Sequence, residues 1–306
     1  MNMTKVAIVV LNRNGKNLTL DCLTSLEDLT FPKDVEIVKI VVDNGSTDGS
    51  VASIKEEFPG VVILQTSANL GFAEGNNVGF RYALEKGADF FVVLNNDTIA
   101  DRDLVEALLE TAREVETGII APKIYFAPGY EFHKDRYLKE QRGKVIWYAG
   151  GLVDWKNVIA SHRGVDEVDS GQYDQVQETD FASGCCFLVP REIFEKIGFF
   201  DKRYFLYFED NDFSQRAKKA GFKIFYAPKA RLWHLNAGTA GGSGSSLQEY
   251  FITRNRLLFG LKFAPLRAKI ALLRQSLFLF LKGNKWQRQG VFDFFLGRFG
   301  KGSYPL

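Results

Sequence analysis

The first hundred residues alternate between two hydrophobic periodicities. Four apolar runs have the length and composition of buried strands, and each is followed by a turn-rich stretch and then by helical spacing. These runs are residues 6–11, 35–42, 61–64 and 90–94. Strands that alternate with helices predict βαβ units and a mostly parallel central sheet flanked by helices. We therefore expect an α/β fold.

Polar side chains follow three of these runs at the point where each run ends. They are Asn12 after the first run, Asp43 and Asn44 after the second, and Asn95, Asn96 and Asp97 after the fourth. The carboxyl ends of parallel strands meet at one edge of a sheet, where ligands of such folds bind, so we expect one shared crevice. Taken alone, the second cluster, in the stretch DNGSTDGS at 43–50, could be no more than an Asx-rich turn with a helix cap.

The second half of the chain begins less regularly. Residues 125–180 contain a Gly-Gly pair, several aromatic residues and mixed charges, which predict strands and long loops over the open side of the site. A short strand, a helix from Pro190 to about Gly198, an aromatic run and a further helix to Ala220 follow. The strand 223–226 comes next.

Two acidic positions are candidates for separate chemical roles. A strand-end carboxylate such as Asp97 suits a divalent cation that also binds a diphosphate. Glu209 and Asp210 start a helix beside aromatic residues, where a carboxylate can act as a general base. Ordinary capping also favours acids in a first helical turn, and that alternative stays open.

The three cysteines exclude a disulfide framework. Cys185 and Cys186 are sequence neighbours and Cys22 is distant, so we expect buried packing residues in a reducing, cytoplasmic compartment. The apolar run at the N-terminus is too short for a signal peptide and suits a first strand better.

The net charge of +2 is unevenly distributed along the chain. Residues 251–306 carry eleven Lys or Arg against one acid, Asp293, which leaves 28 basic and 36 acidic residues, a net charge of −8, in residues 1–250. Apolar residues at helical spacing, interrupted by Pro265, predict a basic amphipathic helical extension over 247–306 after a catalytic domain over 1–246.

The composition of this extension favours an anionic membrane surface over nucleic acid, and we expect no nucleic-acid partner. Its longest uncharged run is too short for a spanning helix, which needs ~18 apolar residues. Helices that pack on the catalytic domain, or on a second copy in a homodimer, are an equally open alternative.

Seven motifs occur in a characteristic order. They are VVLNRNG at 9–15, VDNGSTDGS at 42–50, NLGFAEGNNVG at 69–79, LNNDT at 94–98, SGCCFLVPRE at 183–192, FEDNDF at 208–213 and LWHLNAG at 232–238. From residue 5 to about 260 the chain resembles the family 2 glycosyltransferases, inverting enzymes of the GT-A fold with a Rossmann-like nucleotide-binding half. It is most similar to their rhamnosyltransferase-like and galactofuranosyltransferase-like branch.

The resemblance implies a set of donor-binding residues. In it Asp43 resembles the carboxylate that reads the nucleotide base, and the glycine-rich loop lets the backbone approach the nucleotide. The side chains expected around the donor are Asn12, Asp43, Asn44, Asn69, Gly71, Asn77, Asn95, Asn96 and, facing the diphosphate, Arg254.

The resemblance also implies a metal site and a base. Asp97 matches the last acid of the DxD signature, which holds Mg²⁺ or Mn²⁺, and His234 matches a histidine that completes metal or diphosphate binding. Asn95 stands where the family often has an acid, so we expect the metal to bind weakly without donor. Asp210 matches the base that deprotonates the acceptor, with Glu209 beside it. The neighbours of His234 also suit a core histidine.

These roles predict an inverting, metal-dependent transferase of cell-surface polysaccharide synthesis. It would move rhamnose or galactofuranose from a dTDP- or UDP-type nucleotide sugar to a hydroxyl of a glycan or lipid-linked glycan, in the cytoplasm and in peripheral contact with the inner face of the membrane. The alternatives are a sugar nucleotidyltransferase, for which LNRNGKN is a poor phosphate loop, and a catalytically silent nucleotide-sugar-binding protein.

Overall fold

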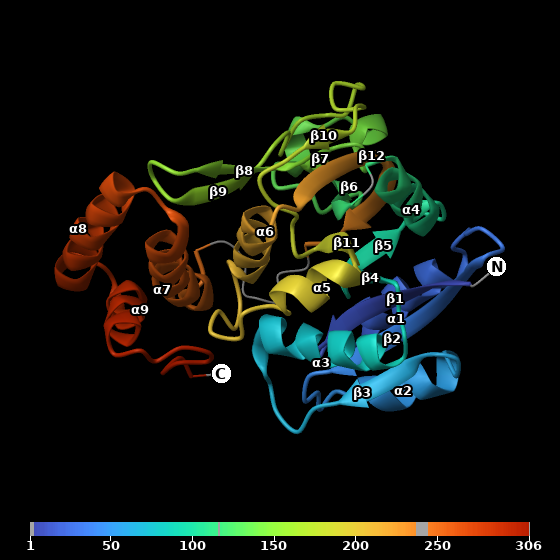
Figure 1. Cartoon of the computed structure of the whole chain (residues 1–306), viewed down its shortest axis with the longest axis horizontal. Helices are drawn as coiled ribbons and strands as arrows, with labels where there is room; N and C mark the ends of the chain where they lie inside the picture. The colour runs from blue at the N-terminus through green and yellow to red at the C-terminus, as the bar shows by residue number, and fades with distance from the viewer. Residues whose placement is uncertain (1–2, 116, 237–243, 306) are drawn as a thin grey trace.

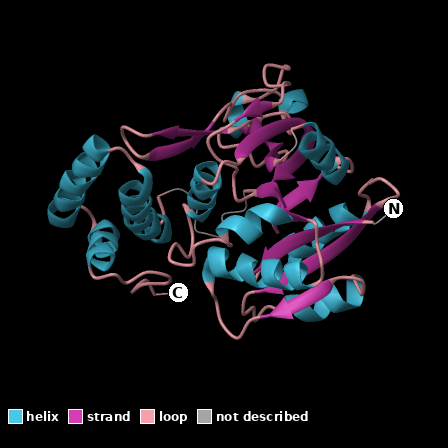
Figure 2. Cartoon of the chain, viewed as in Figure 1, coloured by secondary structure: helices cyan, strands magenta, loops and turns pink. Residues whose placement is uncertain are grey.

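The computed structural model of the chain describes residues 3–115, 117–236 and 244–305. One ten-stranded sheet forms its centre, and a group of three helices lies to one side (Figures 1 and 2). The strands follow the order β10-β12-β6-β11-β4-β1-β2-β3, with β5 paired to β12 and β7 paired to β6. This mostly parallel α/β sheet confirms the predicted fold class.

Four parallel strands build the first half of the sheet, as the periodicities predict. β1 pairs with β2 and β4, and β2 pairs with β3. The elements are β1 (Thr4–Asn12), α1 (Lys16–Glu27), β2 (Val35–Asp43), α2 (Ser50–Glu57), β3 (Val62–Gln65), α3 (Gly71–Glu85) and β4 (Phe90–Asn95). Five consecutive residues of β1, from Val6 to Val10, are buried, so both faces of the sheet are covered.

The second half of the sheet is mixed. β11 lies antiparallel to β4, whereas β12 lies parallel to β6. The elements are β5 (Thr98–Ala100), α4 (Leu104–Glu114), β6 (Gly118–Phe126), the 3₁₀ turns η1 (Lys134–Arg136) and η2 (Lys139–Gln141), β7 (Ile146–Tyr148), β8 (Gly151–Asp154), β9 (Ile159–His162), β10 (Gln177–Glu178), β11 (Cys186–Pro190), α5 (Arg191–Ile197), α6 (Glu209–Lys219) and β12 (Lys223–His234).

β12 runs well beyond the predicted end of its strand at Tyr226. Its pairing with β6 shifts register between Ala227 and Arg231, around Pro228. Proline has no backbone N–H and is tolerated in strands at such irregularities. The strand therefore resumes after the bulge and ends at His234, where it pairs with β5.

The strand registers bring the polar clusters to one edge of the sheet. Asn12 is the register partner of Asp43 at the carboxyl ends of β1 and β2, and Leu11 is the partner of Asn95 in β4. The predicted convergence of three strand ends is therefore a property of the fold.

Three helices follow the sheet: α7 (Ser246–Phe263), α8 (Leu266–Lys282) and α9 (Lys285–Phe295). Leu257, Phe259, Leu272 and Val291 form an apolar cluster between them, which includes Tyr204 from the loop before α6. Within the described residues, none of the helices combines the length and the hydropathy that a membrane span needs. The division into domains at residue 246 stays a prediction.

Candidate active site

Asp43 lies in a buried polar network at the ends of β1 and β2. The Asn12 side chain donates to its carboxylate at 3.0 Å, and the backbone N–H of Ser46 donates at 3.1 Å. Asn12 in turn accepts from the hydroxyl of Thr19 at 2.9 Å, which itself accepts from Asn96. The network fixes the orientation of the Asp43 carboxylate and connects it to the end of β4.

A second amide cluster shapes the loop before α3. Asn44 is buried, and its side chain donates to the Asn69 side chain and to the Gly71 carbonyl, both at 3.1 Å, while accepting from the Leu70 N–H at 2.9 Å. The Asn69 oxygen also accepts from the Gly71 N–H at 3.0 Å. Together these bonds close the loop against the end of β2, next to Asp43.

Gly71 allows two segments of the site to approach closely. Its φ is +81°, in the left-handed region, and an added Cβ would lie 2.5 Å from the Phe205 ring and 2.6 Å from the Phe205 carbonyl oxygen. The Phe205 carbonyl accepts the N–H of Phe72 at 2.6 Å. The start of α3 is therefore in direct contact with the loop that precedes α6.

We expect Gly71→Ala to lower the free energy of unfolding by about 2–4 kcal/mol, because it adds both backbone strain and a clash. Urea denaturation measures this loss. Gly49→Ala is the matched control: Gly49 has φ +80° and no atom within 4 Å of the added Cβ, so it adds strain alone. Equal losses in the two variants would show that the Phe205 contact is not tight.

Asp97 and His234 lie together, as predicted for metal ligands. His234 Nε2 is 3.2 Å from Asp97 Oδ1, and each side chain is 8% exposed. The pairing of β5 with β12 produces this contact, since Thr98 is the partner of His234 and the Asp97 carbonyl accepts the Leu235 N–H at 2.8 Å. The last two residues of the LWHLNAG motif lie outside the described residues.

The donor atoms of this pair fit a divalent cation. His234 Nδ1 is buried and has no hydrogen-bond partner within the part of the chain that the structure describes, although buried imidazole nitrogens normally have one. No group of three or more His, Cys, Asp or Glu side chains suited to a metal occurs among those residues. One carboxylate and one imidazole suit Mg²⁺ or Mn²⁺ when phosphate and water supply the remaining ligands.

Asp210 is the partly exposed carboxylate at the start of α6. Its Oδ2 accepts the Gly184 N–H at 2.8 Å, and its Oδ1 accepts the Asn211 N–H at 2.7 Å. Burial raises the pKa of Asp210 above its ordinary value, against the lowering effect of these bonds. The carboxylate is thus fixed in position and more basic than a solvent-exposed aspartate, as a general base requires.

Glu209 is more deeply buried than its neighbour. Burial, followed by the charge of Asp210, raises the pKa of Glu209 well above its ordinary value. Its Oε2 has no hydrogen-bond partner among the described residues. Of the two acids, Asp210 is therefore the more accessible to solvent.

A short path of backbone hydrogen bonds connects Asp210 to the end of β4. The Gly184 N–H that Asp210 accepts lies next to Cys185, whose carbonyl accepts the Asn95 N–H at 2.9 Å. Cys186 then pairs with Leu94 in the antiparallel ladder of β11 and β4. The base candidate therefore lies on a segment that adjoins β4, which ends at Asn95 and is followed by Asp97.

The structure places two predicted donor residues in other surroundings. Asn77 is buried on α3 and exchanges two hydrogen bonds with the Phe200 backbone, at 2.9 and 3.0 Å. Arg254 is fully buried in α7 and donates to the backbone carbonyls of Arg203 and Tyr204. The structure does not support the prediction that Arg254 faces the diphosphate, because its guanidinium is buried and bonded to the loop before α6 and to Arg298.

Sequence patterns gave no sign of two further groups. The Gly184 N–H, which holds Asp210, belongs to a small-residue turn with no chemical signature. Asn255 is buried in α7 and bonds to the loop before α6. In the sequence Asn255 belongs to the polar run Thr253-Arg254-Asn255-Arg256, which gives no sign of these contacts.

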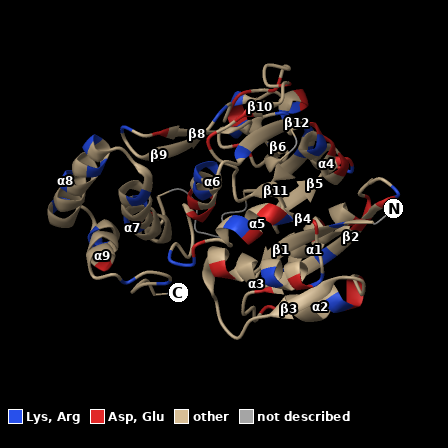
Figure 3. Ribbon diagram, in the orientation of Figure 1, with Lys and Arg blue, Asp and Glu red and all other residues tan. Residues whose placement is uncertain are grey.

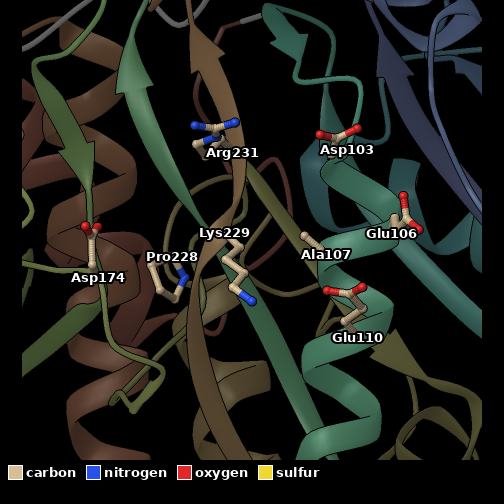
Figure 4. Close-up of a pocket in the computed structure, with 8 residues that line it drawn as sticks. All are labelled: Asp103, Glu106, Ala107, Glu110, Asp174, Pro228, Lys229 and Arg231. Atoms are coloured by element: carbon tan, nitrogen blue, oxygen red, sulfur yellow. The ribbon is translucent and has the colours of Figure 1, made fainter.

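A surface pocket of about 550 Å³ lies between α4 and β12, away from this site (Figure 4). Acidic residues of α4 face the basic residues of β12 across it. Its lining is Asp103, Glu106, Ala107, Glu110, Asp174, Pro228, Lys229 and Arg231. It contains none of the predicted site residues.

Comparisons of sequence identify the class of enzyme. Residues 5–198 match the family model for glycosyl transferase family 2. The N-acetylglucosaminyl-diphospho-decaprenol L-rhamnosyltransferase of Mycobacterium tuberculosis is 28% identical over 232 residues, covering 72% of this chain and 74% of that protein. The low-salt glycan biosynthesis hexosyltransferase Agl10 of Haloferax volcanii is 23% identical over 220 residues, covering 72% of this chain and 66% of that protein.

Solved structures share the fold. GalNAc-T7 with UDP, GalNAc and Mn²⁺ superposes with a TM-score of 0.61 at 15% identity, and the match covers all of this chain but 59% of that one. The mannosyltransferase PcManGT of Pyrobaculum calidifontis, with GDP-Man and Mn²⁺, gives a TM-score of 0.54 at 16% identity. That match covers 99% of this chain and 77% of the mannosyltransferase.

Fold and sequence together define a glycosyltransferase of the GT-A type. The chain belongs to glycosyl transferase family 2. The predicted family and enzyme class are thereby confirmed.

Proposed function

We propose that this glycosyltransferase is an inverting, metal-dependent enzyme that transfers a sugar from a nucleotide diphosphate to an acceptor hydroxyl. The observation that carries the proposal is the placement of two acidic groups on adjoining segments. Asp97 and His234 are 3.2 Å apart at the end of β4, and Asp210 is fixed by the Gly184 N–H beside the same strand. One group suits the leaving diphosphate and the other suits the attacking hydroxyl.

Each side chain has a defined task in this mechanism. Asp43, held by Asn12, contacts the nucleotide base, and Asn95 and Asn96 lie beside the ribose and diphosphate. Asp210 accepts the proton of the acceptor hydroxyl as its oxygen attacks the anomeric carbon. Asp97 and His234 would hold the divalent ion, which neutralises the charge that develops on the departing diphosphate.

The cysteines support a single displacement without a covalent intermediate. Burial, followed by the charge of Asp97, raises the pKa of the Cys185 thiol well above the ordinary value. Burial raises the pKa of Cys22 to about 12. A thiol that stays protonated is a poor nucleophile, so these residues act in packing.

The proposed donor class rests on likeness to a relative and to the family branch. A protein named as an N-acetylglucosaminyl-diphospho-decaprenol L-rhamnosyltransferase matches 72% of this chain, which supports a rhamnose donor and a glycan or lipid-linked acceptor. Galactofuranose and the dTDP or UDP carrier rest on the resemblance of the motifs alone. The transfer would then belong to the synthesis of a cell-surface polysaccharide.

A thermal-shift screen of nucleotide sugars, each with and without Mn²⁺, tests this proposal. A ligand that binds the folded state raises the melting temperature. We expect one dTDP- or UDP-sugar to raise it with Mn²⁺ present and much less without Mn²⁺. A response to free nucleotide triphosphate with sugar phosphate, and to no nucleotide sugar, would indicate a nucleotidyltransferase instead.

We further propose that the outer side of α8 and α9 contacts an anionic membrane. We name as the apolar face the exposed side chains Leu266, Ile270, Leu273, Leu277, Phe278, Leu281, Phe292 and Phe295. Lys and Arg side chains occur along the same helices, and α8 contains no acid (Figure 3). The one acid of the two helices, Asp293 of α9, is fully buried, so the exposed charges that border the apolar face are cations. Such a face complements an anionic bilayer surface.

Leu277→Glu is expected to release the protein from vesicles that contain anionic lipid, measured by sedimentation, because it places an anion in the apolar face. Leu138→Glu is the matched control, since both leucines are 60% exposed and Leu138 lies beside η2. The opposite result would be a wild-type protein that does not bind the vesicles and forms a dimer, which Leu277→Glu dissociates. That result would assign the apolar face to a subunit contact.

A further inference from the structure

The backbone directly before the catalytic helix is held in an unfavourable conformation. Phe205, Tyr207 and Phe208 have φ values of +64°, +68° and +72°, in the left-handed region that side chains with a Cβ avoid. Glu209 and Asp210 follow at once. Three such residues within four positions persist only where the surrounding structure holds them.

The surrounding structure is supplied by the helical extension. Asn255 is fully buried in α7, and its Nδ2 lies 2.8, 2.8 and 2.9 Å from the carbonyl oxygens of Tyr204, Leu206 and Tyr207. The two N–H groups of one side-chain amide are therefore shared among three carbonyls of the strained loop, and at least one of them is bifurcated. A buried amide donor with three acceptors is specific in both position and direction.

Arg254 extends this contact by one residue. Its guanidinium is 3.2 Å from the Arg203 carbonyl oxygen and 3.1 Å from the Tyr204 carbonyl oxygen, and its Nε donates to Asn255 Oδ1 at 3.0 Å. The last bond orients the Asn255 amide with its nitrogen toward the loop. Arg254 thus holds the loop both directly and through Asn255.

The same helix also holds α6 itself. Lys262 of α7 and the Tyr204 hydroxyl both donate to Asp212 Oδ1, and Arg216 donates to Asp212 Oδ2 at 2.6 Å. Asp212 is fully buried in the first turn of α6, two residues after Asp210. Figure 1 shows α7 beside α6, on the side away from the sheet.

We propose that Asn255 and Arg254 are positioning residues for the base Asp210, which makes α7 part of the catalytic unit. The inference rests on the proposed role of Asp210. The loop they hold also accepts the Phe72 and Ala73 N–H groups through the Phe205 carbonyl, so one strained segment fixes both the base and the donor-side start of α3. A base displaced by even a fraction of an ångström loses much of its efficiency.

Asn255→Asp tests this directly, because it keeps the shape and replaces the donating amide by an accepting oxygen. We expect kcat to fall about 10- to 100-fold with the donor KM changed by less than about twofold. Asn255→Leu, which fills the space without donating, should give a similar loss. Gln289→Ala is the control, since it removes an amide of α9 that bonds to Asp293 and Ser303 and not to the loop.

Hydrogen exchange gives a readout that does not depend on turnover. In Asn255→Asp the N–H groups of Phe72 and Ala73, which bond to Phe205, and of Gly184, which bonds to Asp210, should exchange faster than in Gln289→Ala. Wild-type kcat and wild-type exchange in both Asn255 variants, at a temperature well below their unfolding, would overturn the proposal. A loss of kcat in the Asn255 variants that is no larger than their loss of folded protein would also overturn the proposal.

The two proposals fail in different ways. If Asp210→Asn keeps wild-type turnover, the assignment of the base is wrong, and the positioning role falls with it. If Asp210→Asn is inactive while the Asn255 variants keep wild-type turnover and exchange, the base assignment stands and the positioning role alone is refuted.

Discussion

Asp210→Asn is expected to lower kcat by roughly 10²- to 10⁴-fold, the usual contribution of a positioned general base. The asparagine oxygen can still accept the Gly184 N–H, which keeps one anchor at the start of α6, whereas the amide nitrogen can accept neither the Asn211 N–H nor the proton of the acceptor. Donor binding should survive, because the proposed donor contacts lie at the ends of β1, β2 and β4. Titration with the nucleotide sugar and Mn²⁺, alongside turnover, measures both.

The pH profile of the wild type gives the same assignment independently. Only the carboxylate form of Asp210 accepts a proton, so activity should fall as the pH drops through its pKa. Burial raises that pKa above the ordinary value of 3.8, which moves the acid limb of kcat to higher pH than an exposed aspartate would give. Asp180→Asn, which removes a carboxylate bound to Lys218 of the same helix, should leave the limb in place.

If Asp210→Asn retained wild-type turnover, or if the acid limb persisted unchanged in a weakly active Asp210→Asn, another group would be the base. Glu209 would be the next candidate, since it is adjacent in sequence. Because Glu209 is buried, a role for Glu209 as the base would contradict the assignment of Asp210.

Asp97→Asn is the second change with a large expected effect. It removes the one carboxylate of the metal pair, and we expect kcat/KM to fall by roughly 10²- to 10³-fold, as for other losses of transition-state charge stabilisation. Higher Mn²⁺ concentration should restore part of the activity, since His234 and the donor diphosphate remain. Initial rates over a range of Mn²⁺ concentrations measure both effects.

Asp101→Asn is the matched control for this variant. Asp101 follows β5 on the same segment, but its carboxylate forms an ion pair with Arg231, 3.1 Å away, outside the predicted site. Its loss should change neither the rate nor the Mn²⁺ dependence appreciably. An Asp97→Asn enzyme with an unchanged Mn²⁺ dependence would place the metal elsewhere.

The strand ends could be predicted from sequence because their signals are local. A buried parallel strand reads as a continuous apolar run, and Asn12, Asp43 and Asn95 each follow such a run. The rule that carboxyl ends share an edge then placed them together without any knowledge of the strand order. The register of β1 with β2 and β4 agrees with that reasoning.

The contact between Asp97 and His234 needed more than periodicity. The apolar pattern ended the strand at Tyr226, because Pro228 interrupts it, and the continuation of β12 to His234 depends on pairing with β5 and β6. The family resemblance supplied the histidine, whereas the structure supplies the 3.2 Å contact.

The relation of Arg254 and Asn255 to the site could not be read from sequence. Their acceptors are backbone carbonyls about fifty residues earlier in the chain, and backbone carbonyls have no sequence signature. The positive φ values of Phe205, Tyr207 and Phe208 could not be predicted from sequence either, because aromatic residues do not indicate that conformation as glycine does. The sequence therefore suggested that Arg254 contacts the ligand, whereas in the structure Arg254 bonds to the backbone of the loop before α6.

The stereochemistry of the product tests the central claim most directly. The donor selected by the thermal-shift screen is incubated with enzyme, Mn²⁺ and acceptor, and the one-bond C1–H1 coupling of the transferred sugar is measured by NMR. A single displacement with Asp210 as base predicts an anomeric configuration opposite to that of the donor. Retention of the donor configuration would contradict it, because retention requires a second displacement or a different path.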